Sequence, residues 1–140
     1  MVEFPDGTRV HGRGLGRPRP DGPEPDFGLY LGTSRLRRKH GGRITWPHEW
    51  VTWPDFLLPV HPAEAREKIK ALHERAKGET VEVACYGGAG RTGTVMACLA
   101  VLSGVPAGEA VAWTRTHYHE RAVETPWQRG WVKSFAKRLD

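Results

Sequence analysis

The centre of this chain carries the run Cys85-Tyr86-Gly87-Gly88-Ala89-Gly90-Arg91-Thr92-Gly93. Residues 80–84 before it form a short apolar run typical of a buried strand, and residues 94–102 after it form an apolar run typical of a helix. A glycine-rich turn between a strand and a helix exposes unpaired backbone N–H groups at the positive end of the helix dipole. The pattern therefore predicts an anion site in this turn.

A cysteine and an arginine stand at the two ends of the turn. The positive field that attracts a phosphate also favours the thiolate form of Cys85, which is the nucleophilic form. The planar guanidinium of Arg91 offers paired donors to two phosphate oxygens. The alternative, in which Cys85 is a small buried apolar residue, fits the flanking glycines poorly. We expect the anion to be surrounded by the backbone N–H groups of Tyr86, Gly87, Gly88, Ala89, Gly90 and Arg91.

A proton donor for a leaving group lies thirty positions upstream, in Trp53-Pro54-Asp55. When a thiolate attacks phosphorus, the departing oxygen needs a proton, and a positioned carboxylic acid supplies it. The same group then serves as base for the water that cleaves the phosphocysteine. Trp53 and Pro54 are either ordinary packing residues or the hinge of a loop that closes over the substrate.

These motifs resemble the protein tyrosine phosphatase superfamily, in its small single-domain, dual-specificity-like branch. The family loop C-x-x-G-x-G-R-[ST]-G is matched at every fixed position, the W-P-D acid loop is matched with Pro59 four residues on, and residues 124–128 resemble a Q-T-x-x-Q segment. The resemblance covers residues 26–140 approximately. It implies a site made of Cys85 as nucleophile, Arg91 as phosphate binder, Asp55 as general acid and base, Thr92 as hydroxyl donor to the sulfur, and Gln128 as the residue that places the water.

Two positions depart from the family pattern. Ala84 stands where the family usually has a histidine that orients the loop, and Glu124 replaces the first glutamine of the Q-T-x-x-Q segment. A carboxylate near a phosphate dianion is repelled, so we expect Glu124 to point away from the loop. Thr92 also has a second interpretation, as a cap of the following helix.

The length of 140 residues suits one domain, which we expect to span residues 1–140 with a loop-rich segment over residues 1–25, since residues 12–25 are rich in Gly, Pro and Arg. Strands alternate with helices along the rest of the chain. This predicts an α/β domain with a central, mainly parallel sheet flanked by helices on both sides. Strands are expected at 27–31, 50–53 and 80–84, an extended segment at 44–46, and helices at 62–72, at 94–102, from 108 onward and at 127–139.

The net charge is +5, from 21 basic and 16 acidic residues, which suits anionic partners. Arg35, Arg37, Arg38, Lys39 and Arg43 cluster, either as a solvated loop or as a basic rim that selects acidic sequence or extra phosphates. No nucleic-acid motif accompanies them, so we expect no specific nucleic-acid binding. Tyr30, Trp46 and Trp50 are candidates for a pocket wall or for the core.

No apolar run reaches the ~20 residues of a membrane span, and the start of the chain shows no signal-peptide pattern, so we expect a cytoplasmic protein. The chain has two cysteines, too few for a disulfide framework, and Cys98 is expected in the core. His117, His119 and Glu120 have no further ligand cluster near them, so no metal and no cofactor are expected.

The sequence thus favours a metal-independent phosphatase that acts as a monomer on a phosphorylated protein or a small phosphomonoester. Phosphotyrosine is the first choice, with phosphoserine and phosphothreonine as further substrates. Two alternatives stay open. One is a phosphatase of a phosphoinositide, a nucleotide or an RNA 5′ phosphate, and the other is a phosphate-binding module with weak or no turnover.

Overall fold

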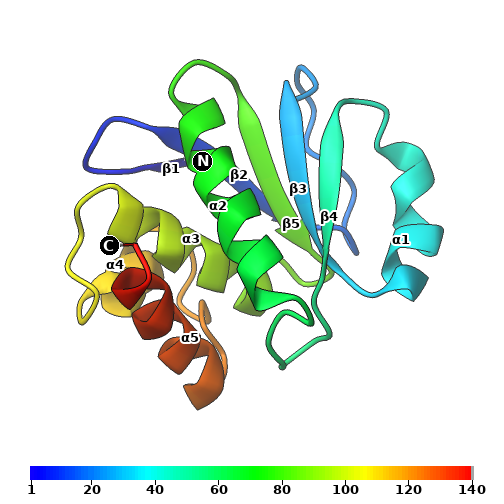
Figure 1. The fold of residues 1–140 in the computed structure, drawn as a ribbon. Coiled ribbons are helices and arrows are strands. Elements are labelled where there is room, and N and C mark those ends of the chain that lie inside the picture. Colours follow the sequence, from blue (N-terminus) through cyan, green and yellow to red (C-terminus); the bar gives the residue numbers. More distant parts are fainter. Residues whose placement is uncertain (140) are drawn as a thin grey trace.

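The computed structural model describes residues 1–139, which form one five-stranded sheet with helices on both faces (Figure 1). The strands are β1 (Val2–Glu3), β2 (Arg9–Gly14), β3 (Phe27–Gly32), β4 (His48–Thr52) and β5 (Val81–Cys85). The helices are α1 (Ser34–His40), the 3₁₀ turn η1 (Gly41–Arg43), α2 (Pro62–Ala76), α3 (Gly90–Leu102), α4 (Ala110–His117) and α5 (Pro126–Lys137).

The sheet has the strand order β1-β2-β5-β3-β4, and every pairing except that of β1 with β2 is parallel. Strand β5 therefore lies in the middle, and its last residue, Cys85, starts the glycine-rich turn at the carboxyl edge of the sheet. Ligands of open parallel sheets bind at this edge. The predicted mainly parallel α/β fold is confirmed.

The two faces of the sheet are covered unequally. Helices α2, α3, α4 and α5 pack on one face, where Leu29, Leu31 and Val83 contribute to the larger core. The other face carries the short helix α1, the loop around Ile44 and the segment after β2 that contains Leu15, over a smaller core. Strand β3 is buried along its whole length because both of its faces are covered.

Tyr30, Trp46 and Trp50 belong to this smaller core, and they do not wall the cleft of the phosphate loop. The Tyr30 hydroxyl donates to Glu82 at 2.7 Å and accepts from the indole of Trp46 at 2.7 Å. Arg13 pairs with the other Glu82 oxygen at 2.6 Å. The buried Glu82 carboxylate is thus fully bonded, as a charge inside a sheet must be.

Strands β1 and β2 occupy part of the predicted loop-rich segment, since Arg9–Gly14 pair in parallel with β5, and its irregular parts are residues 4–8 and those after Gly14. The run Arg-Val-His-Gly-Arg-Gly lacks the alternation of apolar and polar residues that is typical of a strand. It is extended because it hydrogen-bonds to the edge of β5 that β3 leaves unpaired. Glycine is needed here because a Cβ at Gly12 would lie 2.6 Å from the ring of Tyr118.

Other differences from the expected elements are local. The basic cluster lies mostly on helix α1, which begins after the cap residue Thr33, rather than in a loop. Residues 44–46 form no strand, although Ile44 and Trp46 are buried in the smaller core. Helix α5 ends at Lys137, two residues before the predicted end.

A polar link ties the first turn of the chain to α2. The Asp6 carboxylate lies 2.7 Å from His73 Nε2 and accepts a hydrogen bond from the Thr8 hydroxyl at 2.6 Å. Partial burial alone acts to raise the pKa of Asp6, but these hydrogen bonds outweigh it and lower that pKa below its usual 3.8. The ionised form of Asp6 therefore stabilises this end of the fold.

Candidate active site

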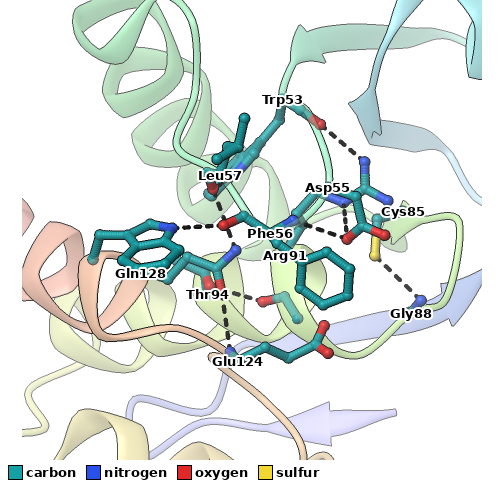
Figure 2. A network of polar contacts seen from close by, with 12 residues as sticks. Trp53, Asp55, Phe56, Leu57, Cys85, Gly88, Arg91, Thr94, Glu124 and Gln128 are labelled. Carbon is teal, nitrogen blue, oxygen red and sulfur yellow. Dashed lines mark hydrogen bonds and ion pairs between the residues drawn. The ribbon is translucent and has the colours of Figure 1, made fainter.

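The phosphate loop runs from the end of β5 into the first turn of α3, and residues 90–100 of that helix are all buried. The helix N-terminus therefore points its unpaired N–H groups at the turn. Cys85 Sγ accepts a hydrogen bond from the backbone N–H of Gly88 at 3.2 Å (Figure 2). Gly88 has φ +79°, a conformation that only glycine adopts without strain, and this conformation aims its N–H at the sulfur.

Arg91 is buried, and its guanidinium connects the phosphate loop to the acid loop. One terminal nitrogen donates to the carbonyl of Trp53 at 2.9 Å. Its Nε lies 3.6 Å from Asp55 Oδ1, an ion pair too long for a hydrogen bond. Arg91 Nε is accordingly a buried donor without a hydrogen-bond partner among residues 1–139, and this is the group that a phosphate oxygen would satisfy.

Asp55 is brought to the same place by the turn after β4. Its side chain is 54% exposed, and its Oδ1 accepts from the Phe56 backbone N–H at 3.0 Å. Phe56 has φ +61°, in the left-handed region that costs a residue with a side chain about 1 kcal/mol. The acid loop is therefore bent sharply directly after its carboxylate, which directs Asp55 toward Arg91 (Figure 2).

The start of α5 holds the acid loop from the other side. The buried Gln128 donates from Nε2 to the Leu57 carbonyl at 3.2 Å, and its Oε1 accepts from the Glu124 backbone N–H at 3.0 Å. The exposed indole of Trp127 donates to the Phe56 carbonyl. Both polar ends of the Gln128 side chain are thus bonded to backbone, so its visible role here is to hold the acid loop.

Glu124 does not point away from the loop as its charge predicts. A Cβ at Gly90 would lie 1.9 Å from Glu124 Oε1, so the carboxylate rests directly on the first residue of α3. The positive end of that helix attracts an anion, which accounts for the position. The absence of a side chain at Gly90 leaves the space for it.

Thr92 is fully buried, and its hydroxyl has no hydrogen-bond partner among the described residues. The predicted bond to the Cys85 sulfur is therefore not made in this structure. The hydroxyl does not cap α3 either, because the helix begins at Gly90 without a side-chain cap. Thr92 is left as a second buried donor at the loop.

Tyr118 is a site residue that the sequence reasoning missed. Its hydroxyl donates to the Gly88 carbonyl, and its ring lies against Gly12. Burial, and then the nearby Cys85, raise the pKa of Tyr118, so the phenol keeps the proton that it donates. No motif marks this position, which follows α4 and is far from the loop in sequence.

Gly93 allows the loop to pack against the segment before α5. A Cβ there would lie 2.5 Å from Ala122 Cβ and 2.6 Å from its Cα. Arg115 fixes that segment with hydrogen bonds to the carbonyls of Ala122 and Val123 at 2.9 and 2.8 Å. These hydrogen bonds hold the backbone at Ala122 and Val123 in place, so it cannot easily move away from a side chain at position 93.

The other residues considered from the sequence, Cys98 and the candidate metal ligands near the end of α4, are not part of this site. Cys98 is fully buried in α3, and burial raises the pKa of its thiol well above the ordinary value, as a core role predicts. No cluster of metal-ligating side chains occurs within residues 1–139, so His117, His119 and Glu120 do not gather into one. No helix in that part of the chain is long and apolar enough to cross a membrane.

The family model for protein-tyrosine phosphatases matches residues 29–123. This chain belongs to the protein-tyrosine phosphatase family. The match runs from the middle of β3 to the segment that Arg115 fixes, and so includes Asp55, Cys85 and Arg91. The resemblance stated from the sequence motifs is thereby confirmed.

One sequence relative and two solved structures show what this chain is similar to. An uncharacterized protein of Methanocaldococcus jannaschii is 43% identical over 63 residues, which are 45% of this chain and 42% of the relative, so the chain spans about two fifths of that protein. Tk-PTP in its active form has a TM-score of 0.73 at 24% identity, over 99% of this chain and 97% of that one. PTPMT1 in complex with PI(5)P has a TM-score of 0.62 at 20% identity, over 79% and 76%. At these identities the two structures establish the shared fold.

Proposed function

We propose that this chain is a phosphatase that hydrolyses phosphate monoesters through a phosphocysteine intermediate, without a metal ion. One observation carries the proposal: Asp55, thirty residues before the loop that holds Cys85 and Arg91, lies beside that loop at one edge of the sheet. The Asp55 carboxylate lies 3.6 Å from Nε of Arg91, and Arg91 is in the first turn of α3, the helix that follows the Cys85 loop. Nucleophile, anion binder and proton donor are the three groups that this chemistry requires.

In this proposal the phosphate is bound by backbone and side-chain donors at the turn, among them Arg91 Nε, which has no hydrogen-bond partner among the described residues. The loop N–H groups of residues 86–91, the N-terminus of α3 and Arg91 Nε supply positive charge around the dianion. Their attraction strengthens as negative charge builds on the equatorial oxygens in the transition state. Because these groups provide the charge that a metal ion provides elsewhere, the proposal needs no cofactor.

The reaction then has two steps. The Cys85 thiolate attacks phosphorus in line, the bond from phosphorus to the leaving oxygen breaks, and Asp55 gives its proton to that oxygen. A water next attacks the phosphocysteine, Asp55 takes a proton from the water, and the sulfur–phosphorus bond breaks to release inorganic phosphate. The buried hydroxyl of Thr92 turns to the sulfur in this second step and stabilises the thiolate that departs.

Gln128 has a positioning role in this scheme. Its amide holds the Leu57 carbonyl, so it keeps the acid loop over the phosphate, and it orders the segment that carries Glu124. The Glu124 carboxylate rests on Gly90 at the start of α3. Placement of the hydrolytic water by Gln128, which the family pattern implies, requires its amide to exchange one of these partners.

For the substrate, we propose a phosphorylated protein with phosphotyrosine first and phosphoserine or phosphothreonine second, bound by a monomer. The half-exposed ring of Tyr86 at the mouth of the loop offers an apolar surface to an aryl group. A phosphoinositide is the second candidate, since the same fold is found in PTPMT1 in complex with PI(5)P. A binding module without turnover is the third, and the absence of a histidine at Ala84 is the feature that favours it.

The test is turnover of p-nitrophenyl phosphate against pH, in EDTA, for the unchanged chain, Cys85→Ser and Asp55→Ala. We expect activity that is abolished in Cys85→Ser, and that loses its decline at high pH in Asp55→Ala because that decline reports the general acid. Full activity in Cys85→Ser would refute the phosphocysteine route. Binding of vanadate without turnover in the unchanged chain would replace the proposal with the binding module.

A further inference from the structure

The cleft in front of the phosphate loop has a second wall, which the phosphatase chemistry does not use. The cleft has a volume of about 400 Å³, and Asp55, Tyr86 and Arg91 line one side of it. The other side is lined by the start and the last turn of α1, namely by Thr33, Arg35, Leu36, Lys39 and His40. Arg35 and Lys39 are four residues apart, so they project from the same side of the helix.

Neither of these two cations has an acidic partner among the described residues. Helix α2 is the contrast, since its Lys68, Lys70 and Arg75 each pair with a glutamate at 2.8–3.3 Å. Of the side chains that line the cleft, only Asp55 is acidic, and it faces Arg91. The α1 wall is thus a positive surface whose charge no side chain of the described chain neutralises.

His40 shows how the charge gathers at the inner end of this wall. Its Nε2 is buried and has no hydrogen-bond partner within residues 1–139, and its ring lies 6.1 Å from the ring of Tyr86. Burial, and then the charges of Lys39 and Arg43, lower the pKa of His40, so the ring is neutral at pH 7. Lys39 and Arg43 thus add to the effect of burial, and an anion bound beside them would offset their charge.

We propose that Arg35 and Lys39 form a subsite for a second phosphate group of the substrate, so that, among small phosphomonoesters, those carrying a further phosphate bind more tightly. The inference rests on the proposed function, because Arg91 and its loop must hold the phosphate that is hydrolysed. Two cations on one helix side match a phosphate dianion better than a single carboxylate. The cleft has the size of a small-molecule site rather than of an extended groove.

The test compares ligands that differ only in their second phosphate. Alkanediyl bisphosphates of increasing chain length, and alkyl monophosphates of the same lengths, are titrated calorimetrically into Cys85→Ser, which prevents turnover. At the best length we expect the bisphosphate to bind about fivefold more tightly, as two partly exposed charge contacts provide. The gain should shrink as salt is raised, because exposed charges are screened.

Two double-alanine variants of α1 test whether the tighter binding of the bisphosphate comes from the subsite. Arg35→Ala/Lys39→Ala, in the same background, should make the bisphosphate and the monophosphate bind equally. Arg37→Ala/Arg38→Ala removes the same charge from the same helix at positions outside the cleft lining, and it should keep the gain. A gain at no chain length, or a gain that survives in Arg35→Ala/Lys39→Ala, overturns the proposal.

Two further measurements are needed. One distinguishes a phosphate from a protein carboxylate as the occupant of the subsite, and the other distinguishes failure of the catalytic proposal from failure of the subsite. A phosphotyrosine peptide with acidic neighbours that shows the gain, where no bisphosphate does, would make the occupant a protein carboxylate and so refute the second phosphate. Turnover of p-nitrophenyl phosphate by the unchanged chain is measured in parallel. If it is absent while the bisphosphate gain is present, the catalytic proposal fails and the subsite stands.

Discussion

Replacing Gln128 by methionine tests whether α5 positions the general acid. Methionine has a similar length and fills the buried space, but it removes both hydrogen bonds of the amide. The Leu57 carbonyl keeps a bond from the Trp53 indole at 2.7 Å, whereas the Glu124 backbone N–H loses its partner. The two losses therefore act on different parts of the molecule and have different sizes.

The magnitudes follow from these partners. The unsatisfied Glu124 N–H costs about 1–3 kcal/mol in the free energy of unfolding, measured by urea denaturation. The lost bond to Leu57 costs the closed acid loop about 0.5–1.5 kcal/mol, which corresponds to roughly a two- to tenfold drop in kcat/KM. This kinetic drop should grow with the pKa of the leaving group across a series of aryl phosphates, because a poor leaving group depends most on the proton from Asp55.

Arg129→Ala is the matched control, an exposed neighbour on the same helix, and we expect it to change neither quantity. An equal loss for good and poor leaving groups in Gln128→Met would refute the role in positioning Asp55, even if stability falls as expected. Unchanged kinetics with poor leaving groups would show that the acid loop closes without this bond.

Three further outcomes follow from the same geometry. Gly93→Ala should destabilise the fold by about 1–3 kcal/mol in urea unfolding, because the new Cβ meets fixed backbone, whereas Gly87→Ala in the same loop meets nothing within 4 Å and should fold normally. Tyr118→Phe removes the donor to the loop, and it should weaken vanadate binding about two- to tenfold in a calorimetric titration; unchanged affinity would show that the loop holds its shape without it. Asp6→Asn should lose stability at neutral pH, and the difference in unfolding free energy from the unchanged chain should vanish as pH falls below 3.8, since a lowered pKa contributes only while the carboxylate is ionised. A difference that persists in acid would show that Asp6 and His73 interact through packing rather than charge.

The Cys85 loop and its flanking elements were predictable from local sequence, because strand, turn and helix are contiguous and their chemistry depends on neighbours in the chain. The same holds for Cys98, whose place in an apolar helix was enough to predict that it lies in the core. The acid motif at Trp53-Pro54-Asp55 was also visible, but only as a candidate at a distance. Its pairing with Arg91 at 3.6 Å is a property of the folded sheet.

Strand β2 shows why part of the fold escaped prediction. Its sequence is polar and glycine-rich, so it carries no pattern of its own, and the strand exists because β5 offers unpaired N–H and C=O groups along one edge. Helix α1 is a similar case. Leu36 is its one apolar side chain, and the other positions belong to solvent or to the cleft.

The sequence by itself was enough to predict the chemistry, because the cysteine, the arginine, the glycine-rich turn and the helix N-terminus of the expected anion site are contiguous in the chain. The tertiary structure alone decided what surrounds that turn. Gln128 and Trp127 donate hydrogen bonds to the acid loop, Tyr118 donates one to the Gly88 carbonyl, and Arg35 and Lys39 line the cleft. These contacts join residues tens of positions apart, and no local pattern records them, because they depend on which elements the sheet brings to its carboxyl edge.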